Sequence, residues 1–360
     1  MKRLFKFSLV ILFMLGVVFI ACNRKNPEVI GPSYVAASEG ITVSLNPVAA
    51  SVNFILTPKL FFTANFSETA TWILTIVGHK SGAVYRVSGT GNGFTNIPWG
   101  GSHSELLFFR TGETVTATVS FFGSSVTASR DIVINRVATF NSCGIFPKNA
   151  DFETPNLVLP PSGNWASFNY PAGTIVNVAQ GITGLNDDST QYPFDRFGNR
   201  VYAVQGVNYY YIKGLGDSPS FVSGLLYQSV TATPITSADP DDVWFNVYVY
   251  GTGDINAMVD MEFQEADLPG NNDYNAKLDD AWVYHLELKH TGWKLISFKY
   301  SDLMISNNPD LGGSGNKKME PNRLRQFDFV LLKKTNPNVP VEMFIDYPIF
   351  TIGGPFKPCK

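Results

Sequence analysis

Most of the chain consists of short segments in which apolar and polar residues alternate. Thr114–Phe121 is representative, because Val115, Ala117 and Val119 alternate there with threonine and serine. Alternation with a period of two places one set of side chains on the core face of a β-strand and the other set on the opposite face. After residue 21, no segment of helical length repeats its apolar residues with the roughly 3.6-residue period of an α-helix. The pattern therefore predicts an all-β protein.

A first group of predicted strands lies within residues 39–137. These segments are rich in β-branched and aromatic residues and are separated by Gly, Asn or Ser, a spacing that indicates a β-sandwich. Trp72, Ser81-Gly82 and Pro98–Gly101 resemble the immunoglobulin-like modules of bacterial surface proteins, so we expect an immunoglobulin-like domain here. The predicted strands are Ile41–Leu45, Lys59–Ala64, Thr71–Val77, Ala83–Val87, Glu105–Phe109, Thr114–Phe121 and Asp131–Ile134.

A second group of strands occupies residues 138–360. These strands are longer, and the loops between them are richer in Asn, Asp and Gly. So many strands in one domain predict a double-sheet jelly roll. The predicted strands are Asn164–Tyr170, Thr174–Ala179, Arg200–Gln205, Tyr209–Lys213, Val222–Gln228, Val243–Gly251, Ala257–Glu265, Ala281–Lys289, Trp293–Tyr300, Leu324–Lys333 and Val341–Thr351.

The N-terminus carries an export signal. Three basic residues within the first six are followed by Phe7–Ala21, which contains no charge and is too short to favour a spanning helix. Phe19-Ile20-Ala21-Cys22 resembles the lipobox of bacterial lipoproteins, although Phe19 replaces the usual leucine. The resemblance implies a signal peptide over residues 1–21 and a diacylglycerol on Cys22. The alternative is an ordinary signal peptide followed by an incidental cysteine.

The residues after Cys22 favour a position at the cell outer membrane. Asn23 stands where the inner-membrane retention signal of lipoproteins has aspartate, and residues 22–38 are polar, with two prolines, as expected of a tether. A lipid anchor of this kind holds a protein stably on a membrane. Whether the protein faces the periplasm or the outside is left open.

Charge and cysteine content narrow the function further. Removing the three basic residues of the signal peptide from a formal net charge of −3 leaves −6, which argues against nucleic acid as a partner. Only Cys143 and Cys359 remain besides Cys22, and the exported compartment permits a disulfide between them. Two free buried thiols are the alternative.

The second domain resembles a known family. Asp151-Phe152-Glu153 opens it, Thr291–Leu303 contains a Trp strand leading to a Ser-Asp turn, and Met343–Phe350 contains an Ile-Asp strand. In this order the motifs resemble the galactose-binding-like jelly rolls that serve as carbohydrate-binding modules. The resemblance implies a structural calcium ion, with Asp151, Glu153 and Asp346 at the matching positions. Ordinary hydrogen bonds at a strand edge are the alternative for these side chains.

No catalytic motif accompanies these features. The sequence contains no HExxH pair, no GxSxG elbow in a strand–turn–helix context and no phosphate-binding glycine loop before a helix. Asp260 and Glu262 approach the acidic strand of the jelly-roll hydrolases but lack a third acid. The chain is therefore predicted not to be an enzyme.

A binding face is better supported. In Val243–Tyr250 the odd-numbered residues are apolar, whereas the opposite face carries aromatic rings and an amide, which suit the C–H faces and hydroxyl groups of sugars. If this strand pairs with the next one as a hairpin across Gly251–Asn256, their polar faces form one platform. A face that is merely solvated, or covered by a loop, is the alternative, and loops 182–198 and 267–280 are secondary candidates. The platform residues are Trp244, Asn246, Tyr248, Tyr250, Glu262 and Gln264.

These observations predict non-catalytic binding of a polysaccharide or oligosaccharide by a cell-envelope lipoprotein. The arrangement resembles the surface glycan-binding lipoproteins that work beside sugar importers in Bacteroidota-type bacteria, which implies association with an outer-membrane importer complex. Two alternatives stay open: a structural or adhesion lipoprotein with a protein partner, and a lipid-anchored glycoside-active enzyme.

Overall fold

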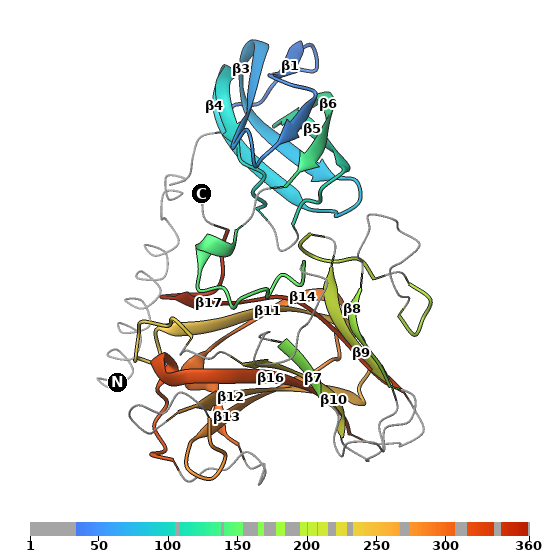
Figure 1. Cartoon of the computed structure of the whole chain (residues 1–360). Coiled ribbons are helices and arrows are strands. Elements are labelled where there is room, and N and C mark those ends of the chain that lie inside the picture. Colours follow the sequence, from blue (N-terminus) through green and yellow to red (C-terminus); the bar gives the residue numbers. More distant parts are fainter. Residues whose placement is uncertain are drawn as a thin grey trace, which may run out of the picture.

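The protein, described here from a computed structural model, is built from β-strands (Figure 1). Within the described residues the only helices are three single 3-10 turns, and no helix is long and apolar enough to cross a membrane. The 3-10 turns are η1 (Asn141–Cys143), η2 (Tyr300–Asp302) and η3 (Pro321–Arg323). The described residues are 34–104, 108–137, 140–153, 165–168, 178–183, 195–199, 201–206, 208–214, 221–228, 233–266, 274–306, 315–334 and 340–358.

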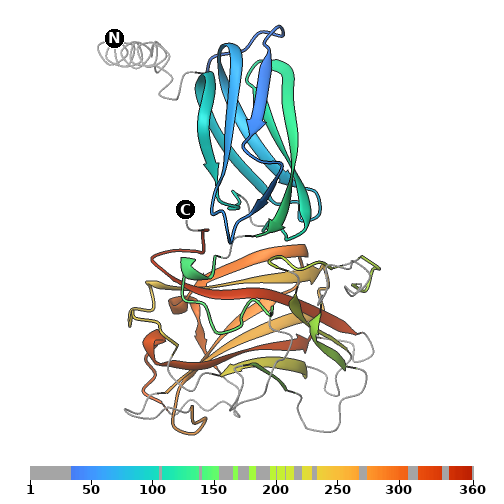
Figure 2. The ribbon, with the colours of Figure 1, turned by 45° about the horizontal axis from the view of Figure 1, so that its top comes forward.

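The first domain is a six-stranded sheet in the order β1-β3-β5-β6-β2, with β4 paired to β3. Its alternating apolar residues form a core of their own around Phe62, Trp72 and Trp99. Figure 2 shows this sheet curling round on itself above the second domain. The strands are β1 (Val43–Pro47), β2 (Ser51–Asn53), β3 (Leu60–Gly78), β4 (Val84–Trp99), β5 (Glu113–Phe121) and β6 (Ser124–Arg136).

Two strand predictions for this domain were wrong. The segments predicted at 59–64 and 71–77 belong to one strand, β3, whose pairing with β4 shifts register between Asn65 and Ala70, where the polar residues interrupt the alternation. Of the predicted strand Glu105–Phe109, residues 105–107 lie outside the described part, and Phe108 and Phe109 lie in no strand; their rings pack into hydrophobic clusters. The immunoglobulin-like assignment stays a prediction.

The second domain is a β-sandwich of the jelly-roll type. We call the sheet β14-β11-β17-β9-β8, which lies next to the first domain, the inner sheet, and the sheet β15-β13-β12-β16-β10-β7 the outer sheet (Figure 1). The all-β fold class predicted from the alternation is confirmed. The strands are β7 (Trp165–Phe168), β8 (Val178–Thr183), β9 (Tyr209–Gly214), β10 (Phe221–Gln228), β11 (Val243–Thr252), β12 (Ala257–Glu265), β13 (Ala281–Glu287), β14 (Thr291–Lys299), β15 (Met304–Ile305), β16 (Leu324–Lys333) and β17 (Val341–Ile352).

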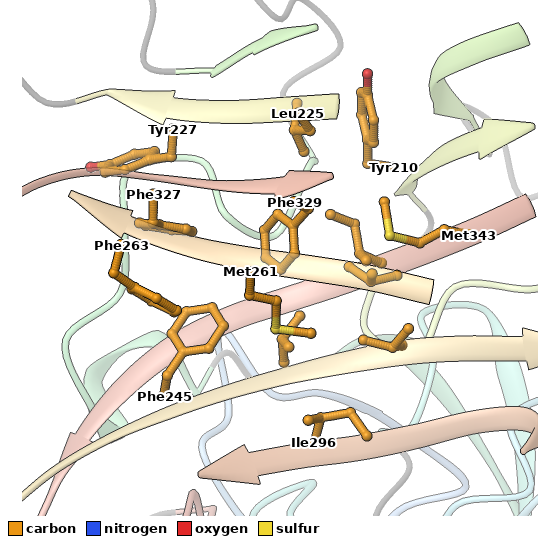
Figure 3. Packing of buried hydrophobic residues seen from close by; sticks show 14 of the residues in the cluster. Tyr210, Leu225, Tyr227, Phe245, Met261, Phe263, Ile296, Phe327, Phe329 and Met343 are labelled. Atoms are coloured by element: carbon orange, nitrogen blue, oxygen red, sulfur yellow. The ribbon is translucent and has the colours of Figure 1, made fainter. Parts of the chain in front are cut away.

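The core between the two sheets is dominated by phenylalanine. The ring of Phe245 from the inner sheet lies 5.0 Å from that of Phe263 and 5.5 Å from that of Phe327, both on the outer sheet (Figure 3). Tilted and edge-on ring pairs of this kind add to the stability that burial of such large side chains provides. The core therefore fixes which face of each strand points outward.

The predicted hairpin between β11 and β12 was wrong. Strand β11 pairs with β14 and β17 in the inner sheet, and β12 pairs with β13 and β16 in the outer sheet. Each strand has one wholly apolar face, and the chain crosses from one sheet to the other at 253–256 so that both faces meet in the core. The polar faces of β11 and β12 consequently lie on opposite sides of the sandwich.

The first domain contacts the inner sheet. The ring of Phe108 lies 5.7 Å from that of Tyr248 and 5.1 Å from that of Tyr347, and Arg110 Nη2 donates a hydrogen bond of 2.6 Å to the carbonyl of Ala203. Residues 201–206, predicted as part of a strand, instead form an irregular segment over this sheet. The outward side of the inner sheet is therefore largely covered.

The predicted disulfide would join Cys143 to Cys359. Cys143 lies in η1, and Ile145 exchanges backbone hydrogen bonds of 2.7 and 2.9 Å with Phe350 near the end of the last strand. Cys359 lies outside the described residues, so the pairing stays a prediction.

If the bridge forms, Cys143→Ser should lower the free energy of unfolding by about 2–4 kcal/mol, because the reduced chain gains conformational freedom when unfolded. Cys359→Ser should cause the same loss, and the double variant no further loss, since all three lack the same bond. Denaturant unfolding without reductant measures these values. Additive losses, or native cysteines that react with iodoacetamide, would show that the bridge is absent.

Candidate functional site

The predicted platform residues of the inner sheet are mostly enclosed. Asn246 is fully buried: its Nδ2 donates to the carbonyl of Ile349 at 3.2 Å and to Thr351 Oγ1 at 3.0 Å, and its Oδ1 accepts the backbone N–H of Phe356 at 2.8 Å. Tyr248 is buried beneath Phe108 of the first domain. Neither side chain can reach a ligand without displacing these contacts.

Trp244 and Tyr250, at the two ends of the same face, are half-buried. Lys299 Nζ lies 5.9 Å from the centre of the Trp244 ring, and the hydroxyl of Tyr250 donates to Asp195 Oδ2 at 3.1 Å. Burial and this carboxylate raise the pKa of Tyr250 to about 12. The continuous platform was therefore a wrong prediction: β11 and β12 lie in different sheets, the middle of the β11 face is covered, and Trp244 and Tyr250 at its ends are half-buried.

Loop 182–198 is described only at its two ends. Residues 184–194 lie outside the described part, and Asp195 accepts the backbone N–H groups of Phe197 at 2.9 Å and Asn199 at 2.8 Å. Burial opposes ionisation of Asp195, but these hydrogen bonds prevail and lower its pKa. Asp195 therefore shapes a turn over the inner sheet.

The outer sheet presents a different surface. Asp260, Glu262 and Gln264 alternate with core residues of β12 and point away from the core. The pairing places them opposite His285 of β13 and opposite Asp328 and Gln326 of β16. We call this set the polar row; its members are Asp260, Glu262, Gln264, His285, Gln326 and Asp328.

Hydrogen bonds connect the members of the polar row. Asp260 Oδ1 lies 2.6 Å from Nδ1 of His285, Gln264 Nε2 donates to Asp328 Oδ2 at 3.1 Å, and Gln326 Nε2 donates to Gln264 Oε1. The imidazole of His285 is the most exposed of these groups. The row therefore places acceptors and donors side by side across three neighbouring strands. Its four members Asp260, Glu262, Gln264 and Asp328 are buried, so His285 and the half-buried Gln326 are the ones open to solvent.

Burial makes this surface electrostatically unusual. It raises the pKa of Asp328 well above the ordinary range, and Glu262, directly opposite, raises it further by like charge and hydrogen bonding. Burial also raises the pKa of Asp260, against the opposing effect of His285. A carboxyl that keeps its proton can donate a hydrogen bond to a neighbouring carboxylate, and Asp328 and Glu262 are hydrogen-bonded to each other.

Tyr274 lies beside the polar row. Burial raises the pKa of its hydroxyl, and the nearby carboxylates of Asp279, Glu262 and Asp328 raise it further. The loop prediction 267–280 is thus described from Tyr274 onward, and residues 267–273 lie outside the described part.

An aromatic pair lies on the same side of the outer sheet. The rings of Phe168 and Phe221 are 6.2 Å apart, and a Cβ on Gly224 would meet the Phe168 ring at 2.1 Å, so this ring lies directly over the glycine. Across neighbouring strands, Phe168 pairs with Gly224, Gly224 pairs with Val330, and Val330 pairs with Asp260. An apolar ring and the polar row therefore occupy one continuous face.

Sequence reasoning missed Asp328, His285 and Phe168 as parts of one face. The alternation around Phe327 and Phe329 does place Asp328 outward. Which strands lie beside β12 could not be read from the sequence, because β16 is far along the chain.

A cluster of oxygen atoms lies on the outward side of the inner sheet, around Asp346, which pairs with Tyr248. Asp346 Oδ2 accepts the backbone N–H groups of Val204 at 2.9 Å and Gln205 at 3.0 Å, while Glu153 Oε1 accepts that of Asn208 at 2.9 Å. Both carboxylates thus hold the same turn. Burial raises the pKa of Asp346 well above its ordinary value, with added repulsion from Glu153 and Asp151.

Three buried oxygens in this cluster have no hydrogen-bond partner: Asp346 Oδ1, Gln205 Oε1 and Asn208 Oδ1. Within the described residues no three Asp, Glu, His or Cys side chains gather closely enough to form a metal site by themselves, so a site here depends on the amide oxygens. Carboxylate and amide oxygens are the ligands that calcium prefers. The residues present fit a calcium ion.

Comparison with known proteins adds little beyond the fold. No protein-family model and no curated protein matches the chain. Among solved structures, the family 11 carbohydrate-binding module of a Clostridium thermocellum cellulase is 13% identical and has a TM-score of 0.34, with 57% of this chain and 92% of that chain covered. A Bacteroides thetaiotaomicron protein described as sugar-binding is 11% identical, with a TM-score of 0.33 over 58% of this chain and 99% of that one. Scores this low carry no argument about ligands.

The raised pKa of Asp328 predicts a pH-dependent stability. A carboxyl whose pKa is higher in the folded than in the unfolded state adds stability below its unfolded pKa, and loses it as pH rises through the folded pKa. Asp328→Asn should therefore stabilise the protein at pH 8, by on the order of 1 kcal/mol. The gain should shrink toward zero below about pH 4, where unfolded aspartate is protonated. Thermal unfolding of both proteins between about pH 4 and pH 8 measures this gain. A stability difference that did not change with pH would contradict the prediction.

Proposed function

We propose that the protein binds a polysaccharide or oligosaccharide, without cleaving it, on the outward face of the outer sheet. The observation that carries this proposal is the polar row, whose buried carboxyl and amide groups support the exposed His285 and the half-buried Gln326. The row continues into the half-buried Phe168–Phe221 pair. Flat rings pack on the C–H faces of sugars, and carboxyl, amide and imidazole groups bind their hydroxyls. The galactose-binding-like motifs of the sequence are consistent with such a ligand.

One observation favours an enzyme as a second candidate. A neighbouring strand supplies the third acid that β12 itself lacks, because Asp328 lies opposite Glu262 and beside Asp260. Glycosidases, however, hold their two carboxyl groups about 5 Å or more apart, on either side of the scissile bond. Glu262 and Asp328 instead hydrogen-bond to each other and restrict each other's ionisation. This arrangement supports binding over hydrolysis.

We further propose that Cys22 carries a lipid that anchors the protein to the outer membrane, where it would work beside a sugar importer. Calcium would be held by oxygens of Asp346, Glu153 and Asp151 together with the amide oxygens of Gln205 and Asn208. Its double charge would offset the repulsion among the carboxylates and fix the turn at Gln205. This ion would be structural, since it lies on the side of the sandwich opposite the polar row.

Affinity gel electrophoresis of the mature protein against a panel of soluble polysaccharides tests the proposed function. Retardation by at least one glycan, without release of reducing sugar, is the expected result. Release of reducing sugar would favour the enzyme instead. No retardation by any glycan would favour the adhesion lipoprotein with a protein partner.

A further inference from the structure

Two exposed aromatic side chains meet at one end of the first domain. Tyr34 and Phe122 are 64% and 53% exposed, and their ring centres lie 5.3 Å apart. Single large apolar side chains are common on protein surfaces, but two rings in contact expose a larger patch that a binding partner could cover.

The backbone holds this pair firmly. The N–H of Val35 donates to Thr71 Oγ1 at 2.9 Å, that of Ala37 donates to the carbonyl of Phe122 at 2.8 Å, and that of Phe122 donates to the carbonyl of Thr71 at 2.9 Å. The segment that carries Tyr34 is therefore fixed against the turn between β5 and β6. An ordered pair loses little conformational entropy when it meets a partner.

The position of the pair indicates which partner this is. Phe122 precedes β6, and β6 ends at Arg136, from which the chain leads into the second domain, so the pair lies at the end of the first domain remote from the second. Tyr34 is twelve residues after Cys22. Twelve residues span at most about 40 Å and on average about 20 Å, so a lipid on Cys22 would keep this end close to the membrane.

We propose that Tyr34 and Phe122 insert into the interfacial region of the membrane that holds the Cys22 anchor. This inference rests on the proposed lipid anchor. Tyrosine and other aromatic side chains that are apolar on one side and hydrated on the other favour the boundary between the lipid headgroups and the acyl chains. The two acids of the neighbouring segments, Glu39 and Glu68, bind Ser125 and Ser38. The proposed contact is made by apolar rings, so we expect it to be insensitive to salt.

This contact would orient the whole protein. The first domain would stand between the membrane and the inner sheet, as its place in Figure 2 suggests, and the outer sheet would face away from the membrane. The exposed His285 of the polar row would then face a large polysaccharide.

The test uses the full-length lipidated protein reconstituted in phosphatidylcholine vesicles. Phe122→Trp adds a fluorescent reporter, and Phe197→Trp is its matched control, because Phe197 is 62% exposed on the second domain. When vesicles are present, we expect the emission added by Phe122→Trp to shift to shorter wavelength. Acyl chains that carry bromine should quench this emission, and both effects should be the same at low and high salt. The emission added by Phe197→Trp should keep its wavelength and intensity.

A second arm separates this contact from the anchor itself. The mature chain is held by an N-terminal hexahistidine tag on vesicles containing a nickel-chelating lipid, which replaces the acyl chains. Quenching in this arm, combined with failure of the native chain to float with vesicles, would support the contact and refute lipidation. If the protein floated with the vesicles but the emission added by Phe122→Trp was quenched in neither arm, the proposed contact would be wrong. It would also be wrong if the protein formed dimers in solution that Tyr34→Ser dissociated, because a second copy would then cover the pair.

Discussion

Asp260→Ala combined with His285→Ala is expected to weaken glycan affinity about a hundredfold. Each of these groups is charged or hydrogen-bonded to a charge, and such hydrogen bonds contribute about 1.5 kcal/mol or more apiece, so the loss of two amounts to about 3 kcal/mol. Removing both partners of their mutual hydrogen bond leaves neither one buried alone, so the fold should persist. Isothermal titration with the glycan found by electrophoresis measures the change, and thermal unfolding confirms that the variant is folded.

Trp244→Ala is the matched control, because it removes a large aromatic ring from the opposite side of the sandwich. It should leave glycan affinity within about twofold of the unsubstituted protein, the scatter expected of a remote site. Loss of binding in Trp244→Ala with retention in the double variant would move the site to the inner sheet. Equal loss in both would indicate that the ligand depends on the integrity of the whole domain.

The outward faces of the inner and outer sheets differ in how well the sequence predicted them. Nearly all strands of the second domain were predicted, since alternation is a local property, and β12 carries Glu262 outward as expected. Local alternation does not reveal which sheet a strand joins. The step from β11 to β12 crosses the sandwich, so Glu262 and Trp244, predicted as neighbours, lie on opposite faces.

Burial by distant segments was equally hidden. Tyr248 is covered by Phe108, which is more than a hundred residues earlier, and Asn246 is bound by the backbone of Phe356 after the last strand. An outward-facing aromatic strand looks the same in sequence whether it meets a ligand or another part of its own chain. The partner atoms of Asp346 posed the same difficulty, because Gln205 and Asn208 carry no sequence signal of their own.

Calcium is expected to raise the melting temperature of the mature protein by about 5–10 °C. A ligand present at a hundred times its dissociation constant stabilises the folded state by about 2.7 kcal/mol, and each kcal/mol shifts the midpoint of a domain of this size by roughly 2–4 °C. Adding EDTA should reverse the gain. The physical reason is that three buried oxygens, on Asp346, Gln205 and Asn208, otherwise have no partner.

Asp346→Asn should abolish this response, because it removes a negative charge from the calcium ligands while keeping the shape of the side chain. Glu342→Gln is the matched control: it is a buried carboxyl on the same strand, but its partners are Lys213 Nζ at 3.3 Å and the backbone N–H of Arg196 at 2.8 Å. That variant should melt at a lower temperature with and without calcium, yet keep the full increment. If calcium still raised the melting temperature of Asp346→Asn, or failed to raise that of either variant, the ion would bind elsewhere. If calcium did not raise the melting temperature of the unsubstituted protein, hydrogen bonds alone would hold the cluster.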